Sequence, residues 1–263
     1  MESQIKGICR LGIVPVRANS SDQAEMLTQL LFGDHYSVTQ VSEDGKWMQI
    51  VNHFDQYAGW IDYKQHTEIS DAYFNHLSST EFKISTDINS TILYKKKLIQ
   101  IVIGSVLPIS SSELFEIKEQ FAFNGSSKNI GEKQGFDFLK QIAKNYMNAP
   151  YLWGGKSPFG IDCSGLTQQV FKLCGYKLKR DANQQYHQGV SIASLAEAKP
   201  GDLAFFKNEK DSITHVGILM EDQDFIHASG CVRKDKLDEN GIFNEELSTY
   251  THNLAGIKRL LLS

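Results

Sequence analysis

Cys163 is the side chain in this sequence best placed to act as a nucleophile. Asp162 precedes an apolar run at helical spacing, and Gly175 follows that run. Asp is a favoured N-cap residue and Gly a favoured residue after a helix end, so the pattern predicts a helix over residues 163–174. Cys163 would then lie in the first turn, where backbone amides and the helix dipole favour a thiolate. An isolated cysteine is more often an inert core residue, which is the interpretation that we prefer for Cys174.

Two histidines further along the chain could supply the base that a nucleophilic cysteine requires. His215 lies near the start of the apolar run 214–220, and His227 lies in the run 225–228. The polar residues 221–224 between them are typical of a hairpin turn, which would place His215 opposite or diagonal to residues 227–229, within about 5–8 Å. One imidazole can then act as the base while the other fixes its tautomer. Either histidine alone would more often be an ordinary strand residue, so the prediction rests on the pair.

Residues 129–263, which contain these side chains, have the pattern of an α+β domain. An apolar stripe at helical spacing predicts a helix over 135–148, ahead of the helix that carries Cys163. Three runs typical of strands follow, at 202–206, 214–220 and 225–228. Helices followed by strands that are joined in hairpins are typical of the α+β class.

Residues 1–75 have the pattern of a small β-barrel or sandwich. Short runs typical of strands are separated by turn-forming residues and cover 14–17, 36–41, 47–51 and 57–61. Residues 23–32 have apolar side chains at helical spacing, although an extended conformation is also compatible with them. We expect Trp60 in the core of this domain.

Residues 76–128 are less regular and are expected to form a second small β unit. Further runs typical of strands cover 91–94, 98–108 and 114–117. The polar, turn-rich stretch 124–129 is the best candidate for a linker to the second half of the chain.

The composition is that of an ordinary globular protein, with 41% hydrophobic and 22% charged residues among 263. A net charge of −4 gives no electrostatic reason to expect nucleic acid or a membrane as a partner, and no run approaches the ~20 apolar residues of a membrane span. The four cysteines lack zinc-site spacing and are too few for a disulfide scaffold, so we expect no metal, no cofactor and a reducing compartment. The first residues do not resemble an export signal, which predicts a cytoplasmic protein; removal of a signal would instead imply a periplasmic or extracellular one.

Five short motifs occur in a fixed order, and together they resemble the NlpC/p60 family of cysteine peptidases. The motifs are Tyr151-Leu152-Trp153-Gly154-Gly155, Asp162-Cys163-Ser164-Gly165-Leu166, Pro200-Gly201-Asp202-Leu203, His215-Val216-Gly217-Ile218 and Ile226-His227-Ala228. The resemblance implies a papain-like α+β fold in which Cys163 is the nucleophile, His215 the base and His227 the residue that orients the base. The stretch 57–61 likewise resembles bacterial SH3 (SH3b) modules.

The resemblance also implies a substrate. Members of this family cut peptidoglycan stem peptides, and the combination with SH3b modules is similar to the γ-D-glutamyl-L-diamino-acid endopeptidases that require a free N-terminal L-Ala. In that subgroup an SH3b Glu, an SH3b Tyr and the Asp before the nucleophile hold the substrate amine; here they would be Glu25, Tyr57 and Asp162. Two carboxylates and a phenol can hold an ammonium group, whereas an acetylated amine would leave them unpaired. A solvated Glu25 and a core Tyr57 are the simpler structural alternatives.

Further residues around Cys163 are candidates for binding the peptide. Ser164 and the neighbouring Arg180 and Asp181 could contact it, although Arg180 and Asp181 could instead form a structural ion pair. Tyr151 and Trp153 could shape the pocket, with aromatic packing as an equal alternative.

The sequence therefore predicts a papain-like domain over 129–263, preceded by an SH3b domain over 1–75 and a second SH3b-like module over 76–128. The expected function is hydrolysis of the bond between γ-D-glutamate and the diamino acid, meso-diaminopimelate, in cell-wall peptide recycling. We expect a monomer whose partner is the peptidoglycan-derived peptide substrate. A non-catalytic protein that binds cell-wall peptides, and an amidase or transpeptidase on the same fold, are the alternatives.

Overall fold

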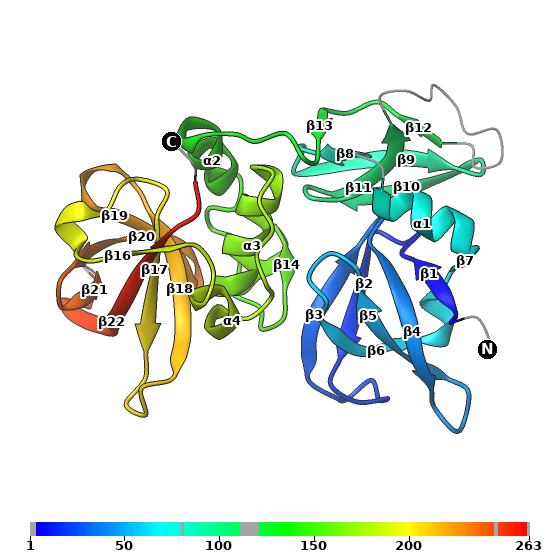
Figure 1. Ribbon diagram of the computed structural model, residues 1–263, viewed down its shortest axis with the longest axis horizontal. Helices are drawn as coiled ribbons and strands as arrows, with labels where there is room; N and C mark the ends of the chain where they lie inside the picture. The colour runs from blue at the N-terminus through cyan, green and yellow to red at the C-terminus, as the bar shows by residue number, and fades with distance from the viewer. Residues whose placement is uncertain (1–3, 80–81, 111–120, 245–246, 262–263) are drawn as a thin grey trace. The chain divides into compact units, whose positions relative to one another are not determined.

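The chain divides into two compact units, Met1–Glu132 and Lys133–Ser263 (Figure 1). The computed structural model describes residues 4–79, 82–110, 121–244 and 247–261. The strand predicted at 114–117 lies outside the described residues. None of the helices in the described ranges is long and apolar enough to cross a membrane.

The first unit contains an antiparallel sheet in which seven described strands follow the order β3-β2-β6-β5-β4-β1-β7. These strands are β1 (Lys6–Ile8), β2 (Ile13–Arg17), β3 (Met26–Leu31), β4 (His35–Val41), β5 (Trp47–Asn52), β6 (Ala58–Asp62) and β7 (Glu68–Ile69), with the short 3-10 helix η1 (Tyr63–Gln65) before β7. Alternate residues of β2 and β4, among them Val14, Val16, Tyr36 and Val38, point into one apolar core. The strands predicted at 14–17, 36–41, 47–51 and 57–61 are confirmed.

Two features of this sheet bear on the expectations for residues 23–32 and Trp60. Of the two conformations compatible with residues 23–32 the extended one is found, because Met26–Leu31 pairs with β2 as strand β3. The apolar side chains of β3 do not alternate with polar ones, because the consecutive Leu30 and Leu31 are both buried although they point to opposite faces of the strand. Trp60 is only partly buried, since β6 turns Gly59 and Ile61 inward and Trp60 to the other face.

Residues 82–129 form two small sheets, with the strand orders β10-β9-β12 and β11-β8-β13 in the described part of the chain. Their elements, together with the preceding helix, are α1 (Asp71–Ser79), β8 (Phe82–Ser85), β9 (Asn89–Tyr94), β10 (Lys97–Val102), β11 (Val106–Ser110), β12 (Phe121–Phe123) and β13 (Ser127–Asn129). The run 98–108 is two strands rather than one, because the chain turns at Gly104, whose φ is +87°. The stretch 124–129 is not a free linker, since β13 pairs with β8. The domain division at residue 75 would fall inside α1, and a second SH3b-like module over 76–128 stays a prediction.

The second unit combines helices with a sheet of the order β16-β22-β17-β18-β19-β20-β21 among the described residues, and β21 also pairs with β22. Because β21 pairs with β22, the six strands β22, β17, β18, β19, β20 and β21 form a closed ring. The helices are α2 (Phe136–Lys144), α3 (Cys163–Leu173) and α4 (Ala182–Tyr186), with the short 3-10 helices η2 (Leu195–Glu197) and η3 (Glu221–Gln223). The strands are the hairpin β14 (Lys156–Ser157) and β15 (Gly160–Ile161), then β16 (Val190–Ile192), β17 (Leu203–Lys207), β18 (Ile213–Leu219), β19 (Asp224–Ser229), β20 (Cys231–Asp238), β21 (Gly241–Asn244) and β22 (Thr249–Arg259).

Helix α3 packs against β18 and β19, the two strands that carry the predicted base and orienting histidine (Figure 1). Its N-cap is Asp162, whose side chain accepts a hydrogen bond from the Gly165 amide, and Gly175 follows its end with a φ of +82°. Both helix signals in the sequence are therefore confirmed. This arrangement brings the first turn of α3 to the start of β18.

Candidate active site

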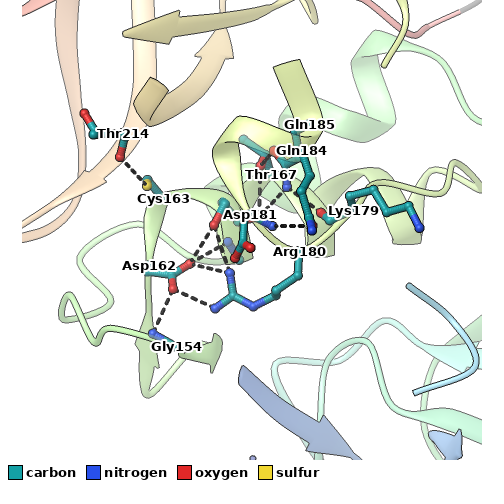
Figure 2. A network of polar contacts seen from close by, with 12 residues as sticks. Gly154, Asp162, Cys163, Thr167, Lys179, Arg180, Asp181, Gln184, Gln185 and Thr214 are labelled. Atoms are coloured by element: carbon teal, nitrogen blue, oxygen red, sulfur yellow. Dashed lines mark hydrogen bonds and ion pairs between the residues drawn. The ribbon is translucent and has the colours of Figure 1, made fainter. Parts of the chain in front are cut away.

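Cys163 is buried at the first position of α3, beside the start of β18. Its thiol donates to the carbonyl oxygen of Thr214 over a sulfur–oxygen distance of 4.0 Å (Figure 2). The backbone N–H of Val216 also lies close enough to stabilise a thiolate. Thr214 and Val216 flank His215, so the structure places the candidate nucleophile against the backbone on both sides of the candidate base.

The thiolate expected from the helix position is not the resting form of Cys163. The pKa of this thiol is raised to about 12, mainly because the side chain is buried and also because of the charge of Asp162. The amides of Val216 and Ser164 lower the pKa, but burial outweighs them. Burial and the neighbouring His227 and His252 likewise hold the pKa of His215 well below its usual range. Thiol and imidazole are therefore both neutral at neutral pH.

The two predicted histidines contact each other directly. His215 Nε2 and His227 Nδ1 are 2.7 Å apart, and the ring planes are nearly perpendicular. In the β18–β19 pair Gly217 lies opposite His227, so His215 is diagonal to it, as the hairpin turn predicts. A Cβ at position 217 would lie 2.8 Å from the Cβ of His227 and 2.5 Å from the Phe225 ring. The absence of a side chain at Gly217, two residues after His215, therefore leaves the space that His227 needs beside β18.

Two residues that the sequence reasoning missed complete this cluster. Asp235 on β20 accepts from His227, with a distance of 2.9 Å between Nε2 and Oδ2. His252 on β22 stacks on His215, with ring centroids 4.3 Å apart. The alternation of β20 after the turn at Gly230 could have placed Asp235 diagonal to His227. No local signal indicates His252, because β22 joins the sheet through pairing with strands distant in sequence.

The carboxylate of Asp162 connects the first turn of α3 with two other segments (Figure 2). It accepts from the amides of Gly165 at 2.6 Å and Gly154 at 2.8 Å, and from both terminal nitrogens of Arg180 at 3.0 and 2.6 Å. Ser164 donates to Asp162 at 3.3 Å and accepts from Arg180 at 2.9 Å. Asp162 and Ser164 thus hold the Gly154 loop and Arg180 at the start of α3, and their predicted contacts with substrate stay predictions.

The other candidate binding residues of the second unit lie around this site. Tyr151 is half-buried, and its pKa is raised to about 12 by burial and then by Cys163 and Asp162, so its hydroxyl stays a hydrogen-bond donor. Trp153 is 58% exposed on the loop that leads to α3. Asp181 precedes α4, and its backbone amide donates to Gln184 at 3.4 Å. Their roles in binding stay predictions.

The two candidates of the first unit lie at the starts of strands. Glu25 is exposed immediately before β3, and Tyr57 is partly buried immediately before β6. The part predicted for them in holding the substrate amine stays a prediction. In the described ranges, no group of three or more His, Cys, Asp or Glu residues is arranged to hold a metal ion.

Comparison with known protein families matches both halves of the chain. The family described as NlpC/P60 family matches residues 148–251, which contain Cys163, His215 and His227. The family described as Bacterial dipeptidyl-peptidase Sh3 domain matches residues 16–65. The boundaries of both matches lie within the two compact units.

Individual relatives cover most of the chain. The gamma-D-glutamyl-L-lysine dipeptidyl-peptidase of Bacillus subtilis (strain 168) is 30% identical over 220 residues, which cover 76% of this chain and 71% of the relative. A protein of the same name from Bacillus cereus (strain ATCC 10987 / NRS 248) is 27% identical over 89% of this chain and 75% of its own length. The crystal structure of an NlpC/P60 family protein from Bacillus cereus ATCC 10987 has the same fold, with a TM-score of 0.78, 21% identity and coverage of 98% of this chain and 100% of that one.

Proposed function

Because the chain belongs to the NlpC/P60 family of peptidases, we propose that it hydrolyses the γ-D-glutamyl–L-diamino acid bond of peptidoglycan stem peptides with a free N-terminal L-Ala. The family and the α+β fold predicted from the motifs are thereby confirmed, and the chain is a hydrolase. The observation that carries the proposal is the placement of Cys163 beside His215, whose ring bonds to His227. The two Bacillus relatives, both named for the γ-D-glutamyl-L-lysine bond, support the choice of bond.

The neutral pair of Cys163 and His215 implies that the proton moves as the sulfur attacks. In this mechanism His215 accepts the thiol proton while the Cys163 sulfur bonds to the γ-glutamyl carbonyl carbon. The backbone amide of Cys163, at the start of α3, can donate to the oxyanion that forms. His215 then returns the proton to the leaving amine of the diamino acid. Water, with His215 again as the base, hydrolyses the thioester and restores the thiol.

Recognition of the free amine and the cellular setting are further parts of the proposal. The amine would bind Asp162, Glu25 and Tyr57, the residues that match the subgroup motif. The diamino acid is either L-lysine, as in the names of the two Bacillus relatives, or the meso-diaminopimelate predicted from the sequence. A requirement for a free amine suits peptides already released from the wall, and therefore peptide recycling.

The test incubates the full chain with L-Ala-γ-D-Glu-L-Lys, with its meso-diaminopimelate counterpart and with N-acetylated forms of both. We expect mass spectrometry to show the dipeptide L-Ala-D-Glu, with its γ-carboxylate free, from the free-amine peptides only. Cys163→Ala should abolish the reaction, whereas Cys174→Ala, a buried cysteine at the other end of α3, should not. Activity retained by Cys163→Ala would refute the mechanism.

The same experiment separates the alternative functions. Peptide binding without products would support a non-catalytic protein that binds cell-wall peptides. A ligated product would support a transpeptidase, and cleavage at another bond would support an amidase.

A further inference from the structure

Asp235 ends a hydrogen-bonded chain that starts at the candidate base. His215 Nε2 lies 2.7 Å from His227 Nδ1, and His227 Nε2 lies 2.9 Å from Asp235 Oδ2. The Asp235 side chain is only 4% exposed. Arg233 Nη2 donates to its other oxygen, Oδ1, at 3.0 Å, and Arg233 Nε lies 2.9 Å from Oδ2. We propose that Asp235, held by Arg233, is a positioning residue that fixes both imidazoles in the one tautomer pair that leaves His215 Nδ1 free to accept the Cys163 proton.

The proton positions follow from what each atom can donate. An ionised carboxylate only accepts hydrogen bonds, and although burial alone would raise the pKa of Asp235, the hydrogen bonds from His227 and Arg233 lower it. His227 must therefore carry its proton on Nε2. In a neutral His227 the other nitrogen, Nδ1, is then an acceptor, so His215 donates to it from Nε2. A neutral His215 with its proton on Nε2 has a bare Nδ1, which is the atom left to act as a base.

Arg233 holds this arrangement in place. Its Nη2 and Nε atoms lie 3.0 and 2.9 Å from the two carboxylate oxygens of Asp235, so the ion pair fixes the position of the carboxylate that accepts from His227. The guanidinium also balances the charge of this buried carboxylate. Among the described residues, His227 contacts His215 on β18, Asp235 on β20 and His252 on β22, and Asp235 is the carboxylate of this group.

Nuclear magnetic resonance of the full chain labelled with ¹⁵N-histidine tests the proton positions directly. We expect the proton on Nε2 in both His215 and His227, with the signals assigned by His215→Gln and His227→Gln variants. A proton on Nδ1 of His227 in the unaltered protein would overturn the proposal. The measurement needs no substrate and no variant of Asp235, so it stands even if the variant fails to fold.

Asp235→Asn should remove the requirement for a single tautomer, because an amide has both a donor end and an acceptor end. Arg233 lies close to both oxygen positions, so the amide can be placed either way round, and its NH₂ end would require His227 Nε2 to be an acceptor. We expect part of the histidine protons to move to Nδ1 and kcat to fall about 10- to 100-fold with KM little changed, as for other partners that orient a functional histidine.

Asp224→Asn is the matched control. Asp224 also pairs across β19 and β20, with Lys234 at 2.8 Å and Lys236 at 2.7 Å, but it bonds to neither histidine in the described structure. Equal kcat values and equal tautomers in the Asp235→Asn and Asp224→Asn variants would overturn the proposal. The activity readout rests on the proposed function, and failure of that function would appear separately, as absence of cleavage by the unaltered protein.

Discussion

Among single side chains, Cys163 has the property that most affects reactivity. Its raised pKa, about 12, means that the thiol holds its proton at neutral pH and that the thiolate fraction grows about tenfold per pH unit until that value. The first turn of a helix favours an anion, but removal of the sulfur from water costs more here. In the free protein Cys163 is therefore a thiol. The thiolate forms only when His215 removes the proton during attack on the substrate carbonyl.

Alkylation of Cys163 by iodoacetamide should accelerate steadily from pH 6 to pH 10. The thiolate is the reacting form, and a raised pKa places its growth above the neutral range. Peptide mapping by mass spectrometry would follow the Cys163 peptide, with partly exposed Cys231 as an internal comparison. A rate that is already constant above pH 6 would reveal a preformed thiolate and contradict this expectation.

We expect His252 to contribute to kcat through stacking of its ring on His215 rather than through a charge. Burial and then the charge of His227 lower its pKa to about 4, so it stacks on His215 as a neutral ring and does not repel the imidazolium formed in the reaction. His252→Ala should lower kcat about 3- to 10-fold, the equivalent of an aromatic pair worth about 0.5–1.5 kcal/mol. His252→Phe should retain most of the activity. His187→Ala is the control, at an exposed histidine of the same unit, and should retain all of the activity. Equal losses in the Ala and Phe variants would show that a ring nitrogen, not stacking, is required.

Among strands and helices, the β18–β19 pair sets the distance between the two imidazoles. Gly217→Ala would place a methyl group 2.8 Å from the Cβ of His227 and 2.6 Å from the Ile226 carbonyl oxygen. We expect a loss of about 1–3 kcal/mol in the free energy of unfolding, as for other overpacked sites, and a fall in kcat because His227 is displaced. Thermal melts and steady-state kinetics would measure both.

Gly135→Ala provides the comparison for that variant. A Cβ at Gly135 meets nothing within 4 Å, so the same added methyl group should leave kcat unchanged. If Gly217→Ala changes kcat and the free energy of unfolding no more than Gly135→Ala does, the β18–β19 pair accommodates the added methyl group and the expectation is wrong.

The parts of the site that the sequence predicted are those fixed by local pattern. The Asp162 cap and Gly175 define α3 and therefore place Cys163, and the turn between β18 and β19 brings His215 and His227 together. His252 could not be predicted, since β22 pairs with β17 and β21 across long stretches of sequence and with register shifts in both pairs. Strand β3 was ambiguous because apolar residues on both of its faces hide the period of two that identifies a strand. The raised pKa of Cys163 depends on burial, which local spacing does not reveal.

For the chain as a whole, the predicted tasks divide between the two units. The second unit holds Cys163, His215 and His227, and the first holds Glu25 and Tyr57. If these two residues help to select the free amine, Glu25→Gln and Tyr57→Phe in the full chain should raise KM for L-Ala-γ-D-Glu-L-Lys, while kcat stays within about twofold, since neither residue touches the reacting atoms. Steady-state kinetics with the free-amine and N-acetylated peptides would measure the preference.

Glu43→Gln, at another exposed glutamate of the first unit, is the control for these variants. Unchanged KM in Glu25→Gln and Tyr57→Phe would assign amine selection to the second unit alone.

The closure of the second sheet through β21 and β22 has a consequence for which polypeptides this peptidase can hold. Extended peptides commonly bind by adding a strand to an open sheet edge. Closure of the ring gives the strands that carry His227, Asp235 and His252 neighbours on both sides. Strand β18 pairs with β19 only over residues 217–219, so its first residues, among them His215, pair with β17 alone. The proposed substrate, a γ-linked D-glutamyl peptide, lacks the regular main-chain spacing of a strand and would be held by its amine and carboxylates instead. Closure of the ring therefore limits the strand edge beside Cys163 to the short start of β18.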